Sequence, residues 1–361
     1  MKRRLLSIVL LCIGKSIFCQ VSAIHTVFLI GDTGKDTLAS PAIQLLKSEI
    51  EKTPNSTVVF LGDNVYPNGL SIDANHPEVV TIPQKKMVSQ LEIFKEYKGN
   101  VFMVPGNHDW NKCKWNGKQW IKDEAVFMEN YLKKNTSIAN KNEEAFFPKE
   151  AGPGPVSIQL KESLRLVIID TQWWLQQQFF HPVGTDKGKN KRSTKERFYR
   201  QLDSLLTVAD KNNERVLLAA HHPLFSNGRH SNARQPWRFL INYTPLQVLG
   251  LLGLNRFFMQ DIPQPRYKKM KRELMEVIDK HKNIIYVSGH DHNLQFSKHG
   301  NLYHIISGAG SFHSKVKEKE DLLFYKSQSG LFKLSYFANG QILVEAMDSY
   351  NKEVFFSYWV K

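Results

Sequence analysis

Five short apolar runs along the chain each end at a turn that carries glycine or proline together with polar side chains. The runs read FLI, VVFL, VFMVP, RVLLAA and NIIYVS, and each is rich in β-branched or aromatic residues. Continuous apolar runs of about strand length are typical of strands buried on both faces. We therefore expect five buried strands, each followed by a polar loop, with the loops converging at one edge of a sheet.

Helix-like segments separate these runs, and the alternation predicts an α/β layered fold. The expected helices are Pro41–Glu51, Gln84–Tyr97, Asp123–Lys133, Thr194–Ala209 and Tyr267–Lys280. After the last polar loop, Leu302–Ile306, Leu331–Phe337 and Gln341–Ala346 read as consecutive strands. They predict an all-β tail that forms a second sheet packed on the first.

The N-terminus reads as a secretory signal peptide over residues 1–23. Basic residues from Lys2 to Arg4 precede an apolar stretch, Leu5 to Ile13, and a small-residue exit at Val21 to Ala23. The apolar stretch is shorter than the ~20 residues that span a bilayer, although an uncleaved anchor remains the alternative. The leader predicts a secreted or periplasmic protein. We also expect one catalytic domain over residues 24–361, because no repeat of about 20 to 50 residues is present.

Cysteine and charge content narrow the chemistry. Cys12 and Cys19 lie in the leader, so Cys113 is the only cysteine of the expected mature chain and no intramolecular disulfide can form. The formal charge of +15 falls to about +11 without the four basic residues of the leader. This charge favours anionic partners, namely phosphorylated small-molecule or protein substrates, and a merely solubilising surface is the alternative. No recognition helix or RNA-binding pattern predicts specific nucleic-acid binding, and nothing indicates an obligate protein partner.

Two segments interrupt the alternation. Residues 176–196 are polar and basic, and we expect a mobile surface loop near the site. We expect residues 229–266 to form an insertion, which contains an apolar stretch, 246–258. This stretch predicts a covering helical hairpin, and peripheral contact with a membrane or a partner is the alternative.

The polar loops after the five strands carry side chains that ligate metals. They are Gly31-Asp32-Thr33-Gly34, Gly62-Asp63-Asn64-Val65-Tyr66, Gly106-Asn107-His108-Asp109, His221-His222-Pro223 and Gly289-His290-Asp291-His292. Hard metals prefer oxygen and imidazole ligands, and a pair of them about 3.5–4 Å apart can clamp a phosphoryl group. We expect Asp63 to bridge two metals, Asp32 to bind the first and Asn107 the second.

The histidines and one tyrosine complete this expectation. His290 and His292 are two residues apart, which in an extended segment places both imidazoles on one face. His221 adds an imidazole to the second metal, whereas His222 is expected to point away and to act structurally. A phenol such as that of Tyr66 loses its proton only near pH 10, so its binding as a phenolate requires a strong Lewis acid such as Fe(III).

These motifs resemble the calcineurin-like metallophosphoesterase superfamily, and within it the small purple acid phosphatases, also called tartrate-resistant acid phosphatases. The resemblance rests on Gly62–Tyr66, Ala220–Pro223, Gly289–Gln295 and Ser307–Phe312, and runs from about Val27 to near the C-terminus. It implies a four-layer α/β/β/α sandwich of two mixed sheets with a dinuclear metal centre between their loops.

The resemblance also implies a ligand set and a mechanism. Fe(III) would be bound by Asp32, Asp63, Tyr66 and His292, and a second metal, Fe(II), Zn or Mn, by Asp63, Asn107, His221 and His290. A metal-activated hydroxide would attack phosphorus and His108 would protonate the leaving group at acidic pH, with Asp109 orienting His108. A role of His108 in orienting a ligand is the alternative.

The leading hypothesis is a secreted acid phosphatase that hydrolyses phosphate monoesters. The first alternative is a phosphodiesterase or nucleotidase on the same scaffold, acting on lipid head groups. The second is a noncatalytic protein that binds metal or phosphate.

Overall fold

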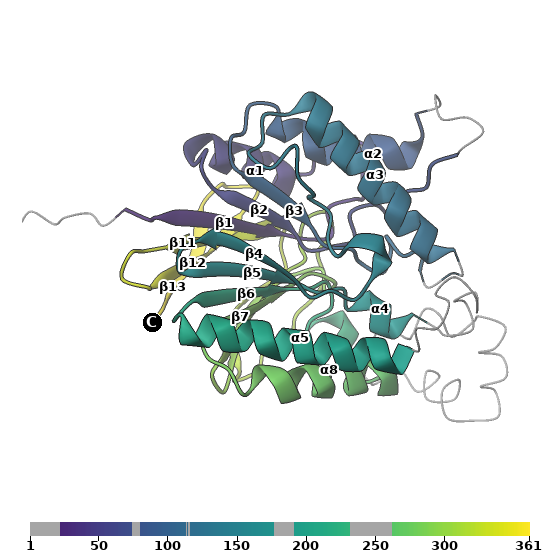
Figure 1. Ribbon diagram of the computed structural model, residues 1–361. Helices are drawn as coiled ribbons and strands as arrows, with labels where there is room; N and C mark the ends of the chain where they lie inside the picture. Colours follow the sequence, from purple (N-terminus) through teal and green to yellow (C-terminus); the bar gives the residue numbers. More distant parts are fainter. Residues whose placement is uncertain (1–21, 74–79, 113, 115, 177–190, 232–261) are drawn as a thin grey trace, which may run out of the picture.

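The computed structural model describes residues 22–73, 80–112, 114, 116–176, 191–231 and 262–361 (Figure 1). In this part of the chain two mixed sheets pack face to face, and helices cover both outer faces, which is the expected α/β/β/α sandwich. The six-stranded sheet contains, in spatial order, β13 (Val354–Val360), β12 (Ile342–Asp348), β11 (Gly330–Tyr336), β1 (His25–Ile30), β2 (Thr57–Phe60) and β3 (Asn100–Met103). The seven-stranded sheet contains β10 (Leu322–Lys326), β8 (Leu294–His299), β9 (Leu302–Ser307), β7 (Ile284–Ser288), β6 (Arg215–Ala219), β5 (Leu164–Ile168) and β4 (Val156–Lys161).

The helices form the two outer layers. The six-stranded sheet is covered by α1 (Pro41–Lys52), α2 (Ile82–Leu91) and α3 (Gly117–Asn135), and the seven-stranded sheet by α4 (Gln172–Leu175), α5 (Lys191–Lys211) and α8 (Pro265–Ile278). Short 3₁₀ helices lie at η1 (Glu92–Phe94), η2 (Lys149–Ala151) and η4 (Arg229–Ser231).

Strand periodicity explains why the apolar runs are continuous. In β1, Val27 and Leu29 point into the core between the sheets, whereas Phe28 and Ile30 point into the core under the helices. Successive side chains of a strand alternate between its faces, so a strand covered on both sides must be apolar at every position. All five expected strands are present as β1, β2, β3, β6 and β7.

The expected all-β tail does not form a second sheet of its own. β9 lies in the seven-stranded sheet, where it pairs in parallel with β7, whereas β11 pairs antiparallel with β1 in the six-stranded sheet. The tail therefore completes both sheets, because β1 and β7 each have a free edge on which a neighbouring strand can satisfy backbone hydrogen bonds.

The expected helices are present with shifted ends. The Thr81 side chain accepts a bond from Gln84 N and starts α2 before the expected Gln84, while α3 extends beyond both ends of Asp123–Lys133. Residues 191–196 belong to α5 and not to a loop, which corrects that part of the expected 176–196 segment.

Several expectations fall on residues outside the described ranges. These are most of the leader, residues 177–190, residues 232–261 with the apolar stretch 246–258, and Cys113. Among the helices that are described, none combines the length and the apolar character needed to cross a bilayer.

Candidate metal centre

The five polar loops meet at one end of the sandwich. Those after β1, β2 and β3 leave the six-stranded sheet, and those after β6 and β7 leave the seven-stranded sheet. Each group of strands is parallel within its own sheet. The loops of the two groups meet, because His221 Nδ1 donates to the Leu61 carbonyl at 2.8 Å. The loops therefore converge from the edges of two sheets, not from one sheet as expected.

One group of donors surrounds the hydroxyl of Tyr66. Its Oη lies 2.8 Å from Asp32 Oδ1, 2.9 Å from Asp63 Oδ2 and 3.2 Å from His292 Nε2. Asp32 and Asp63 are buried, whereas His292 is partly exposed. Four side chains from three loops thus point at a common space.

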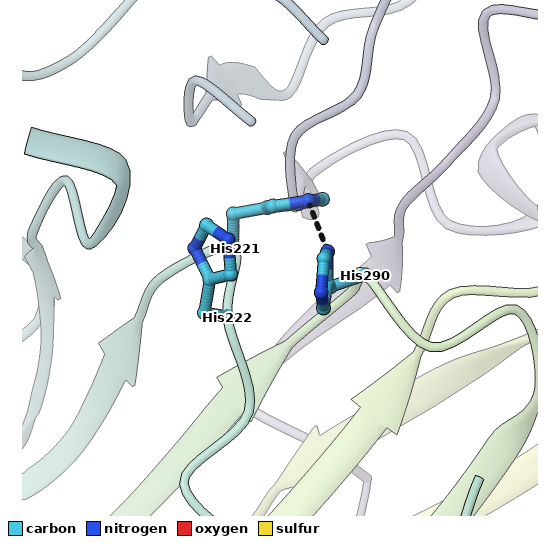
Figure 2. Close-up of side chains that lie close together, drawn as sticks. All are labelled: His221, His222 and His290. Atoms are coloured by element: carbon cyan, nitrogen blue, oxygen red, sulfur yellow. Dashed lines mark hydrogen bonds between the residues drawn. The ribbon is translucent and has the colours of Figure 1, made fainter. Parts of the chain in front are cut away.

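A second group surrounds the side-chain oxygen of Asn107. Asn107 Oδ1 lies 3.0 Å from His221 Nε2 and 3.0 Å from His290 Nδ1. The two imidazole nitrogens are themselves 3.2 Å apart, and the dashed line in Figure 2 marks this contact. Two imidazole nitrogens and an amide oxygen at such distances form a suitable donor set for a cation.

Asp63 belongs to both groups. Its Oδ2 faces Tyr66, and its Oδ1 lies 3.4 Å from His221 Nε2 and accepts a bond of 2.8 Å from His108 N. One carboxylate thus offers an oxygen to each donor group.

The backbone at this centre is strained in a consistent way. Asp32, Asp63 and His290 have φ values of 58°, 54° and 67°, in the left-handed region that few residues other than glycine adopt. At Gly106 a Cβ would come within 2.3 Å of Asp63 Oδ1, so only glycine permits this approach. Strain of this kind typically gathers at functional sites, where the surrounding fold maintains it.

The electrostatics of the cluster suit a cation. Burial, followed by the charges of Asp32 and Asp63, raises the pKa of Tyr66 well above 10. Burial alone would lower the pKa of His221, but Asp63 and Asp32 raise it above its usual value, and Asp32 does the same for His292. Protons on these histidines would balance the carboxylates, and a metal could replace those protons.

His108 lies at the mouth of the centre. Its ring is 19% exposed, its Nδ1 donates to the Pro67 carbonyl at 2.6 Å, and its Nε2 lies 3.8 Å from Asp63 Oδ2. The Pro67 bond selects the tautomer and leaves Nε2 turned toward the donors. Burial lowers the pKa of His108, with Asp63 opposing the change.

Asp109 does not orient His108, which corrects the sequence-based expectation. Its buried carboxylate accepts bonds from Asn64 N, Asn64 Nδ2, Val65 N and Gly106 N. Burial, with the charge of Asp63, raises its pKa to about 7. Asp109 therefore ties the Asp63 loop to the Asn107 loop, and the Pro67 carbonyl orients His108.

His222 lies beside the second donor group and does not point away from it as expected, so its purely structural role stays a prediction. Its Nδ1 lies 2.9 Å from Thr171 Oγ1, and its buried ring packs 4.4 Å from the ring of His290. Figure 2 shows it beside the other two imidazoles, and one nitrogen of each of the three lies within 4.8 Å of the others. The contact with Thr171 fixes one nitrogen of His222, while its buried Nε2 has no hydrogen-bond partner among the described residues.

The sequence did not predict two contributions to this centre, a histidine from the expected insertion and two polar side chains from α2. The ring of His230 lies 4.2 Å from that of His290, although residue 230 was assigned to the insertion. On α2, Gln90 bonds to Thr33 Oγ1 and to the Asn64 carbonyl, and Lys86 donates to the Tyr66 carbonyl. The short distance along the chain between His230 and His221 could have indicated that His230 lies near the centre. No pattern in the sequence indicates that Gln90 does.

The family model described as calcineurin-like phosphoesterase matches residues 25–294. The chain belongs to that family. The match contains every donor from Asp32 to His292, and the family binds a dinuclear metal centre.

Individual relatives of this phosphoesterase are distant. It is 24% identical to glideosome-associated protein 50 of Plasmodium falciparum, over 91% of this chain and 74% of the relative. A solved structure described as GAP50, the anchor in the inner membrane complex of Plasmodium, superposes with a TM-score of 0.54 at 18% identity, covering 93% of this chain and 88% of the other. The purple acid phosphatase PPD1 of yellow lupin (Lupinus luteus) has a TM-score of 0.53 at 16% identity, over 94% of this chain and 54% of that chain. At these identities the structures show a shared fold.

Proposed function

We propose that the protein is a metal-dependent acid phosphatase that is exported from the cell and hydrolyses phosphate monoesters. The observation that carries this proposal is the pair of donor groups that share Asp63. The first group, Asp32, Asp63, Tyr66 and His292, fits Fe(III), because an oxygen-rich set with a phenol matches a strong Lewis acid. The second group, Asp63, Asn107, His221 and His290, fits Fe(II), Zn or Mn.

When bound, the metals supply Lewis-acid chemistry that lowers the pKa of water and offsets charge on phosphoryl oxygens. The chain itself supplies orientation and a proton. Asp63 fixes the spacing of the two donor groups, and its Oδ1 holds the backbone N–H of His108. The His108 ring then presents Nε2 over the space that the donors face.

His108 is the group that protonates the leaving alkoxide. Its lowered pKa means that it carries the required proton only at acidic pH, so the rate should fall as pH rises through that pKa. An acid optimum follows from this requirement, and the positive net charge of the chain draws the anionic substrate toward the site.

The likeness to an anchor protein favours one other function, a scaffold without turnover. The intact donor set argues against it, because a scaffold needs no convergence of buried carboxylates and imidazoles, whose desolvation is costly. Phosphodiester hydrolysis is the alternative within the catalytic class.

Turnover by metal-loaded protein separates these functions. We expect faster hydrolysis of p-nitrophenyl phosphate than of bis-p-nitrophenyl phosphate at acidic pH, and a loss of turnover in Asp63→Ala with the fold intact by circular dichroism. A preference for the diester would assign phosphodiesterase activity instead. Absence of turnover on both esters by protein holding two metals would support the scaffold.

A further inference from the structure

The first halves of α5 and α8 form a basic surface on the outer side of the seven-stranded sheet. The two helices lie side by side (Figure 1), and Tyr199 Oη of α5 donates to Glu273 Oε2 of α8 at 2.9 Å. Each helix precedes a parallel strand, β6 or β7, so both begin at the end of the sheet that carries the donor groups. We define the α5/α8 basic face by seven basic side chains of these helices, Lys195, Arg197, Arg200, Arg266, Lys268, Lys269 and Arg272. Lys271 is not included, because its ammonium packs over the Phe225 ring.

The charge of this face is only partly balanced. Lys195 is half-buried and the other six cations are exposed. Glu196, Glu273 and Glu276 of the same helices offset three of these seven charges, which leaves a formal charge of +4 (7 − 3). Lys269 and Arg272 pair with glutamates one helical turn away, at 3.8 and 3.7 Å. Arg197, Arg200, Arg266 and Lys268 form no ion pair in the part of the chain that the structure describes, so these four cations can meet an external anion.

The placement of the cations is unfavourable for the isolated protein. Neither helix has an acidic residue in its first turn, although a helix N-terminus favours anions over cations. Burial lowers the pKa of Lys195, and the charges of Lys269 and Arg266 lower it further against the opposing charge of Glu273. The face is therefore crowded with like charges, a state that an anionic partner would relieve.

We propose that the α5/α8 basic face docks on an anionic phospholipid surface. Charge complementarity supplies the attraction, because clustered Lys and Arg side chains bind anionic lipid head groups. Phe198 and Tyr267 of these helices are buried, and the half-buried Tyr199 is held by its bond to Glu273, so these rings offer no open platform for nucleic-acid bases. This inference does not depend on phosphoester hydrolysis.

Co-sedimentation with vesicles tests the docking. We expect the purified protein to sediment with vesicles made of phosphatidylserine and phosphatidylcholine. With vesicles made only of phosphatidylcholine, the protein should stay in the supernatant. High salt should release the protein from the mixed vesicles. The variant Arg197→Gln/Arg266→Gln/Lys268→Gln should partition about 100-fold less onto the anionic vesicles, because it removes three of the attracting charges. Its circular dichroism and its turnover of a soluble phosphate ester should match the parent protein.

A matched variant removes equal charge elsewhere. Lys47, Lys85 and Lys134 are exposed on α1, α2 and α3, over the opposite sheet, and Lys47→Gln/Lys85→Gln/Lys134→Gln should retain vesicle binding. An equal loss in both variants would show general charge attraction and overturn the docking face. Equal binding to vesicles with and without phosphatidylserine, or no binding to either, would also overturn it. Binding of duplex DNA through this face without binding of vesicles would identify nucleic acid as the partner instead.

Discussion

Replacing Asp109 by asparagine tests whether this residue holds loops or acts in catalysis. Its two carboxylate oxygens accept bonds from four buried N–H groups of Asn64, Val65 and Gly106, at 2.7 to 3.2 Å. Asparagine keeps one oxygen and places an NH₂ group where the other stood, so about two donors lose their acceptor. A buried polar group without a partner costs about 1–3 kcal/mol, so Asp109→Asn should lower the free energy of unfolding by about 2–6 kcal/mol.

Denaturant unfolding and metal analysis check this prediction. Asp123→Asn is the control, since Asp123 also accepts backbone and side-chain bonds, from Ile72 N and Gln119 Nε2. Asp123 is only half-buried on α3, so this change should cost less than about 1 kcal/mol. We expect Asp109→Asn to lose metal as well as stability, while the residual activity keeps its fall toward alkaline pH. The reasoning would be refuted if the variant had normal stability and metal content but its activity fell at a different alkaline pH. Asp109 would then act on His108.

Three further predictions address the α2 contacts, the phenol and the strand core. Gln90→Leu removes the bonds to Thr33 and Asn64 and should weaken metal binding by about 10–100-fold; unchanged affinity in a metal titration would contradict this role. Tyr66→Phe should stay folded but lose the visible absorption band expected of the iron-loaded protein, and a persisting band would indicate another chromophore. Burial lowers the pKa of His25 from 6.5 to about 4, so its contribution to stability is complete above pH 6.5 and is lost as pH falls toward 4. His25→Gln should reduce that loss. The check is the change in urea midpoint between a pH above 6.5 and a pH near 4, and an equal change in the variant and the parent protein would exclude His25 as the cause.

The sequence determined the parts of this protein that depend on local patterns. A strand covered on both faces must be apolar throughout, so β1, β2, β3, β6 and β7 were recognisable, and the polar residues after them marked the loops. Because parallel strands point their carboxyl ends the same way, the convergence of Asp32, Asp63 and His290 could be expected before their distances were known. The residues paired within each donor group also followed from the motifs, and their geometry supports the proposed metal sites.

Only the tertiary structure decided which distant segments complete the centre. The tail strands joined two different sheets because each sheet offered an edge, and strand periodicity does not say which edge a strand will fill. Asp109 turned away from its neighbour His108 because four N–H groups from two loops needed an acceptor, which its position in the sequence does not reveal. Gln90 and His230 likewise reach the centre through packing. Long-range hydrogen bonds and ring contacts depend on how layers stack, and that information lies in no single stretch of the chain.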